Sequence, residues 1–257
     1  MLYLPAYGVA ERAPLILIHG FCENHRLWRD FVPTLAADFY VLTPDLPGFG
    51  QSPILPELPT MERVATVLAA QLSELGIERV TLVGHSMGGY VSLAFAELFP
   101  ERVAGLCLFH STAAADNEEK RRIRNNLLQV VRRRGSADFM EAFVKSLFYE
   151  PRLPELTQAL SSLQTMVRQT PDETILQYTQ TMRDRSDRQA LLQSAQFPLG
   201  FILGKQDSFI PFELTQAGLP ANALLQVLDH TGHVGMWERP AQTLHFVRQF
   251  AHYCQLA

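Results

Sequence analysis

The residues best placed to do chemistry begin with a serine in a glycine-rich segment. Ser86 stands in the sequence Gly-His-Ser-Met-Gly, after an apolar run at 80–83 and before a helical pattern at 87–99. Glycine two places before and two places after the serine lets the backbone turn sharply from strand to helix, which presents the hydroxyl as a nucleophile. This segment predicts that Ser86 is a catalytic nucleophile.

A base and an acid must accompany such a serine, because an isolated hydroxyl is a poor nucleophile. Asp207 comes just after the apolar segment 198–204, and His233 follows Gly232 in the loop after the apolar segment 223–229. We predict that His233 removes the Ser86 proton and that Asp207 holds the imidazole.

Other residues compete for these roles. His19 and His85 lie inside turn motifs and are interpreted as structural, and His230 ends a predicted strand. Asp45, Asp229 and Glu238 are carboxylates that we place outside the catalytic group. His110 closes the apolar segment 103–109 at the sheet edge where open α/β sheets bind ligands, so it is predicted to bind substrate.

Five motifs in order carry a family resemblance. They are His19-Gly-Phe21, Asp45-Leu-Pro-Gly-Phe-Gly-Gln-Ser52, Gly84-His-Ser-Met-Gly-Gly89, Gly204-Lys-Gln-Asp207 and Gly232-His233. Together with the chain order serine, aspartate, histidine, they make the sequence similar to the lid-bearing α/β-hydrolase superfamily of esterases and carbon–carbon hydrolases. The resemblance implies an α/β fold with a doubly wound, mostly parallel sheet, and an oxyanion hole made by the Phe21 and Met87 amides.

The alternation of apolar and amphipathic segments agrees with that fold. Strands are predicted around 2–7, 15–19, 39–44, 79–84, 103–109, 198–204 and 223–229. Helices are predicted around 28–37, 60–76, 87–99, 187–195, 212–218 and 240–253. Because the N-terminal segment is short, we expect the antiparallel edge hairpin of this family to be trimmed or absent.

The alternation breaks between the strands at 103–109 and 198–204, where helical periodicity predicts an inserted lid. We place the hydrolase core at 1–111 and 185–257 and the lid at 112–184. Asp116 with Glu119 resembles a capping box, Gly135 is a suitable stop, and further helices are expected from Ser136, over 153–168 and from Pro171. Aromatic and Met side chains predicted for the pocket wall, which favour a hydrophobic substrate, are Phe139, Phe143, Met236 and Trp237.

Charge and composition restrict the partners. The net charge is −4, which excludes a general attraction to nucleic acid, and no stretch is apolar over the roughly 20 residues that a membrane span needs. Three cysteines without metal spacing favour a reducing compartment, so we expect a cytoplasmic protein. The basic helical segment 120–134 is interpreted as a solvated face; the alternative is a docking surface for an acidic carrier protein. The sequence gives no prediction of oligomeric state.

The predicted activity is hydrolysis of a hydrophobic small-molecule ester through an acyl-enzyme on Ser86. The mechanism needs no metal or organic cofactor, and no metal-ligand spacing or phosphate-binding glycine loop is present. Three alternatives stay open: a hydrolase of carbon–carbon bonds in diketo acids, a hydrolase of carrier-linked acyl esters, and a ligand receptor with the same fold. A carboxylate-binding arginine in the pocket would favour the diketo acids.

Overall fold

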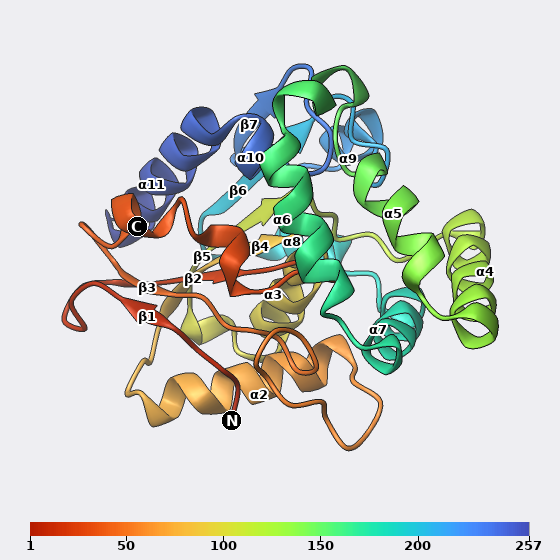
Figure 1. Cartoon of the computed structure of the whole chain (residues 1–257). Helices are drawn as coiled ribbons and strands as arrows, with labels where there is room; N and C mark the ends of the chain where they lie inside the picture. The colour runs from red at the N-terminus through yellow and green to blue at the C-terminus, as the bar shows by residue number, and fades with distance from the viewer. Residues whose placement is uncertain (257) are drawn as a thin grey trace.

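A mostly parallel β-sheet forms the centre of the molecule in the computed structural model, which describes residues 1–256 (Figure 1). Within these residues the seven strands take the order β1-β3-β2-β4-β5-β6-β7, and only β1 is antiparallel to its neighbour. The strands are β1 (Ala6–Tyr7), β2 (Pro14–Ile18), β3 (Tyr40–Leu42), β4 (Val80–His85), β5 (Val103–Phe109), β6 (Leu199–Gly204) and β7 (Leu224–Leu228). The predicted fold class is confirmed.

The central strands are buried along almost their whole length because helices cover both faces of the sheet. Every residue of β4 and β6 is buried, as expected for parallel strands that never face water. β5 is buried except for Ala104. The registers align the carboxyl ends of these strands, so that His85 pairs with Phe109, and Phe109 with Ile202. The loops that follow these strands therefore open at one edge of the sheet.

The helices of the core lie on the two faces of the sheet (Figure 1). They are α1 (Val32–Leu35), α2 (Met61–Glu74), α3 (Met87–Leu98), α8 (Gln189–Ser194), α9 (Phe212–Ala217), α10 (Gly235–Glu238) and α11 (Pro240–Leu256). In α2 the Thr60 hydroxyl accepts a hydrogen bond from the Arg63 amide and caps the helix. Apolar residues at helical spacing then bury one face of α2 against α3. None of the helices in residues 1–256 is long and apolar enough to cross a bilayer.

Two predicted elements differ at their bounds. The edge strand expected over 2–7 is reduced to Ala6–Tyr7. The helix expected over 28–37 is instead a 3-10 turn (His25–Trp28) followed by the single turn α1. Pro33 explains the break: it lacks the N–H that a continuous helix would need there, whereas a proline fits the first turn of a new helix.

Four helices occupy the predicted insertion, and α4 packs against α7 while α5 packs against α6 (Figure 1). They are α4 (Glu118–Arg134), α5 (Ala137–Ser146), α6 (Thr157–Arg168) and α7 (Asp172–Asp184). The third is shorter than predicted, because Pro154 lies in a 3-10 turn (Glu150–Glu155) that precedes it. Gly135 ends α4 with a φ of 75°, as expected of a C-terminal glycine. That 112–184 forms a separate lid stays a prediction.

The cap predicted for α4 was wrong by one residue. The Asn117 side chain accepts the Lys120 amide at 2.9 Å, which is the capping bond that we expected Asp116 to make. Asp116 is instead buried, and its carboxylate binds Arg185 and Arg124. Local spacing did not show this, because Arg185 lies 69 residues further along the chain.

Candidate active site

Ser86 occupies a strained turn between β4 and α3. Its φ of 49° and ψ of −116° lie in a region that non-glycine residues rarely adopt, at a cost of order 1–3 kcal/mol. The turn is closed by glycines: a Cβ on Gly84 would lie 2.5 Å from the Gly88 carbonyl oxygen, and one on Gly88 would lie 2.4 Å from the Ile18 oxygen. The flanking glycines thus allow the backbone to pack directly beneath the serine.

His233 and Asp207 are in direct contact. The His233 Nδ1 lies 2.8 Å from the Asp207 Oδ2, while the Asp207 Oδ1 accepts the Phe209 and Ile210 amides at 2.9 and 3.0 Å. Burial alone would raise the pKa of Asp207, but the charge on His233 and the hydrogen bonds from His110 and His233 hold it well below its usual value. Asp207 is therefore an ionised acceptor, and Nε2 is the His233 nitrogen left free for a proton.

Ser86 and His233 line the same cavity, whose volume is ≈ 190 Å³. Ser86 is half-buried there, and Asp207 is almost wholly covered by the loops around it. The structure thus brings together the three residues predicted for nucleophile, base and acid.

His110 lies behind Asp207 rather than in the cavity wall, so its predicted contact with substrate is not seen. Its Nδ1 donates to the same Asp207 oxygen at 3.0 Å, and the ring is fully buried between Gly204 and Gly235. Burial, the largest effect, lowers the pKa of His110 to about 4, so the ring is neutral. Its Nε2 has no hydrogen-bond partner among the described residues. A φ of 46° at the end of β5 turns the side chain toward the acid instead of the substrate.

A buried ion pair joins the predicted oxyanion turn to the serine turn. The Glu23 Oε2 accepts the Gly20 amide at 2.6 Å and the His85 Nδ1 at 2.9 Å, and the His85 Nε2 donates to the His233 carbonyl oxygen at 2.9 Å. Burial opposes the charge on His85, but Glu23 outweighs it and raises the pKa of His85, and both ring nitrogens face oxygen acceptors. Glu23 was not predicted; only its position four residues after His19 in the turn motif pointed to it.

The Phe21 and Met87 amides lie at the two turns that this pair connects. Within the part of the chain that the structure describes, neither N–H donates to a protein acceptor. His19 supports the same turn, since its Nε2 accepts the Leu46 amide and its Nδ1 donates to the Gly20 carbonyl oxygen. This histidine is structural, as predicted.

A family model described as the alpha/beta hydrolase fold matches residues 13–240. The chain belongs to the α/β-hydrolase family.

Relatives extend over most of the chain. A thermophilic esterase from Thermogutta terrifontis, solved with malate bound, has a TM-score of 0.92 at 29% identity and covers 98% of this chain and 93% of its own. The 2-hydroxy-6-oxononadienedioate/2-hydroxy-6-oxononatrienedioate hydrolase of Cupriavidus pinatubonensis is 28% identical over 87% of this chain and 81% of its own length.

A third relative is the dihydrolipoyllysine-residue acetyltransferase component of the acetoin cleaving system of Pseudomonas putida, 30% identical over 89% of this chain. The chain spans only 60% of that protein's length.

The aromatic residues predicted for the pocket of this α/β hydrolase divide into two groups. Phe143 lines the cavity, whereas Phe139 does not line it and instead stacks on Phe143 with ring centroids 5.4 Å apart, so its prediction as pocket wall was wrong. Met236 and Trp237 do not line the cavity, so their prediction as pocket wall was wrong. Met236 is buried, the Trp237 ring stacks on Phe148 at 6.4 Å, and both residues line a different cavity beside α6.

The basic residues of α4 lie in two different environments. Lys120 and Arg124 line the cavity, whereas Arg132, Arg133 and Arg134 are exposed in the last turn, where cations interact favourably with the helix dipole. Lys120 and Arg124 were not predicted as pocket residues, although their spacing of four residues places them on one helix face. Docking of an acidic carrier protein on the exposed arginines stays a prediction.

A metal ion has one candidate position among the described residues. His110, Asp207 and His233 offer ligand atoms within 4.8 Å of one another. Both Nδ1 atoms already donate to the Asp207 Oδ2, and the second carboxylate oxygen accepts two amides. A metal would have to replace these hydrogen bonds, so the contacts fit a proton-transfer group better than a ligand set.

Proposed function

We propose that this α/β hydrolase is a serine hydrolase that cleaves esters of small molecules with an apolar portion. The observation that carries the proposal is the chain of contacts from Asp207 to His233 beside a strained serine in one cavity. The groups have the arrangement that the reaction requires: an ionised acid, an imidazole bound to it through Nδ1, and a hydroxyl at a strained turn.

In the proposed reaction the Ser86 oxygen attacks the ester carbonyl while the His233 Nε2 takes its proton. The negative charge on Asp207 stabilises the imidazolium that forms. The protonated Nε2 then gives the proton to the departing alcohol, which leaves an acyl group on Ser86. Water attacks this acyl-enzyme with His233 again as the base, and the acid product is released.

The Phe21 and Met87 amides are the proposed donors to the oxyanion of each tetrahedral intermediate. Neither N–H donates to an acceptor among the described residues, so both are free to bind an oxyanion, which supports this role. The Glu23–His85 pair is proposed to fix the turn that carries Phe21 relative to Ser86.

A second candidate is hydrolysis of a carbon–carbon bond in a diketo acid. Two observations favour it: Arg124 lies in the cavity wall, and a relative is named as a hydrolase of a 2-hydroxy-6-oxo dicarboxylate. The same nucleophile and base serve both reactions.

The test is hydrolysis of p-nitrophenyl esters from acetate to dodecanoate, combined with labelling by a fluorophosphonate. Ser86→Ala should abolish both, and Ser161→Ala, which removes an exposed hydroxyl on α6, should leave both unchanged. Labelling without ester hydrolysis would favour the second candidate, hydrolysis of diketo acids. Absence of labelling in the unaltered protein would contradict the proposal.

A further inference from the structure

Two cations of α4 lie in the wall of the same cavity as Ser86. Lys120 and Arg124 are one helical turn apart and half-buried, and Ile123 lines the cavity between them. Lys120 donates to the Phe209 carbonyl oxygen at 3.1 Å, and the Arg124 Nε donates to the Asp116 carboxylate at 3.2 Å. The two contacts fix the stems of both side chains against the core.

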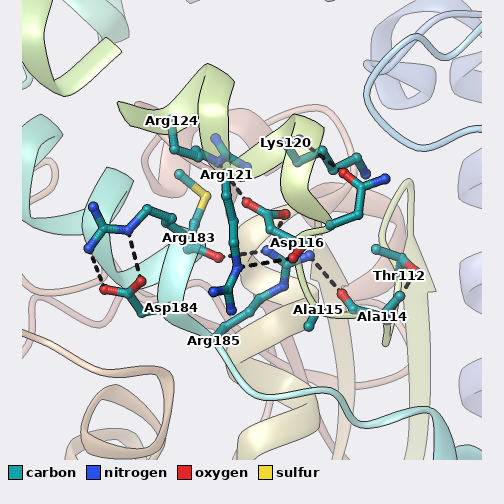
Figure 2. A network of polar contacts seen from close by, with 12 residues as sticks. Thr112, Ala114, Ala115, Asp116, Lys120, Arg121, Arg124, Arg183, Asp184 and Arg185 are labelled. Carbon is teal, nitrogen blue, oxygen red and sulfur yellow. Dashed lines mark hydrogen bonds and ion pairs between the residues drawn. The ribbon is translucent and has the colours of Figure 1, made fainter. Parts of the chain in front are cut away.

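The positive charge at this wall exceeds the negative charge that faces it. Figure 2 shows the Asp116 carboxylate between Arg124 and Arg185, and the Arg185 Nη1 lies 2.6 Å from the Asp116 Oδ1. Asp116 and Arg185 are both buried and form a close pair, so one carboxylate serves two guanidinium groups while the Lys120 ammonium stands beside them. Asp116 lies behind the lining residues, and the carboxylate that does line the cavity, Glu23, is already paired with His85.

Donors remain available on both cations. Lys120 has three N–H groups and one bond, and the terminal nitrogens of Arg124 make no hydrogen bond to the described residues. Burial is the largest effect and lowers the pKa of Lys120. The attraction of Asp116 opposes it, and the smaller repulsion from Arg185 and Arg124 adds to it. A bound anion would accept hydrogen bonds from these free donors and reduce the repulsion between the cations.

The remainder of the wall is mostly apolar. It includes Phe21, Tyr90, Phe143, Leu147, Met182 and Ile210. A ligand that fills the cavity thus contacts the nucleophile, an apolar surface and two cations. In an apolar pocket a few polar groups fix the orientation of the ligand.

We propose that Lys120 and Arg124 bind a carboxylate on the substrate, so that this hydrolase acts on monoesters of short dicarboxylic acids. The inference rests on the proposed function and adds the substrate class. The carboxylate points to α4, the apolar carbons lie along the wall, and the scissile ester lies at Ser86. Water adds hydroxyl to the acyl carbon and a proton to the alcohol, which gives a dicarboxylate and a neutral alcohol.

The test compares two esters that differ only at the chain end: p-nitrophenyl hexanoate and the p-nitrophenyl monoester of adipic acid. The unaltered protein should have a higher kcat/KM for the anionic ester. Arg124→Met and Lys120→Met should each reduce the ratio of anionic to neutral kcat/KM by about 10- to 100-fold, the effect of one charge-assisted hydrogen bond. Arg122→Met removes an exposed charge from the same helix and should leave the ratio unchanged.

Calorimetric binding of adipate to Ser86→Ala keeps the inference separate from catalysis. Suppose that Ser86→Ala binds adipate, that adding Arg124→Met abolishes this binding, and that the unaltered protein hydrolyses neither ester. This result would support the anion site and contradict the proposed function. Hydrolysis of hexanoate with no preference for the anionic ester would overturn the anion site and leave the proposed function intact. If Arg124→Met does not fold, because Asp116 loses a partner, Lys120→Met carries the same comparison.

Discussion

Replacing His110 by asparagine should make this protein more resistant to acid. The native environment lowers the pKa of His110 from 6.5 to about 4, chiefly by burial. Between these two values the unfolded chain binds a proton at this position and the native protein does not, so stability is lost as the pH falls. The full contribution, 2.5 pKa units, corresponds to about 3 kcal/mol.

The measurable part lies between pH 7 and pH 5. With these two pKa values the linkage relation gives a loss of about 2 kcal/mol in the free energy of unfolding over that interval. Asparagine places an amide N–H where the His110 Nδ1 donates to Asp207, and it tolerates the φ of 46° better than most residues. His110→Asn therefore removes the titrating group and keeps the contact.

The assay is urea unfolding at pH 7 and pH 5 for the unaltered protein, His110→Asn and His245→Asn. His245 is exposed on α11, so its replacement should leave the pH dependence unchanged. His110→Asn should lose about 2 kcal/mol less than the unaltered protein on going to pH 5. An equal loss in both would refute the conclusion that the native protein holds His110 neutral.

Three further predictions concern the serine turn and its support. Asp207→Asn should reduce kcat for a p-nitrophenyl ester by roughly 10⁴-fold with little change in KM, because the base loses its orienting charge. Gly88→Ala should destabilise the protein by about 1–3 kcal/mol and abolish fluorophosphonate labelling, because its Cβ would lie 2.4 Å from the Ile18 carbonyl oxygen. Urea unfolding measures the loss of stability, and normal labelling of the variant would contradict the prediction. The pKa of His85 is raised, so its pair with Glu23 stabilises the protein fully below the ordinary value of 6.5 and loses that effect as the pH rises through the raised value. Glu23→Gln should abolish the loss of stability between pH 6 and pH 8. If the free energy of unfolding changes over this interval as much in the variant as in the unaltered protein, the Glu23–His85 pair does not cause the loss.

The sequence by itself determined the sheet and the serine turn. Mostly apolar runs such as β4 and β6 favour a parallel sheet that is covered on both faces, and their spacing along the chain fixes the alternation with helices. The serine turn needs residues without a Cβ at positions 84 and 88, and Gly84 and Gly88 meet this requirement. Such constraints act within a few residues, so they can be recognised without the fold.

Only the tertiary structure decided what the charged side chains do. Asp116 binds Arg185 and does not cap α4, His110 supports Asp207 across 97 residues of sequence, and Glu23 pairs with His85 across 62. A buried charge must find a partner or be neutralised, and the partner is whichever group the fold brings near. Sequence shows which helix carries Lys120 and Arg124, but the packing of α4 over the serine decides that these two cations, and not the five other basic residues of the helix, line the cavity.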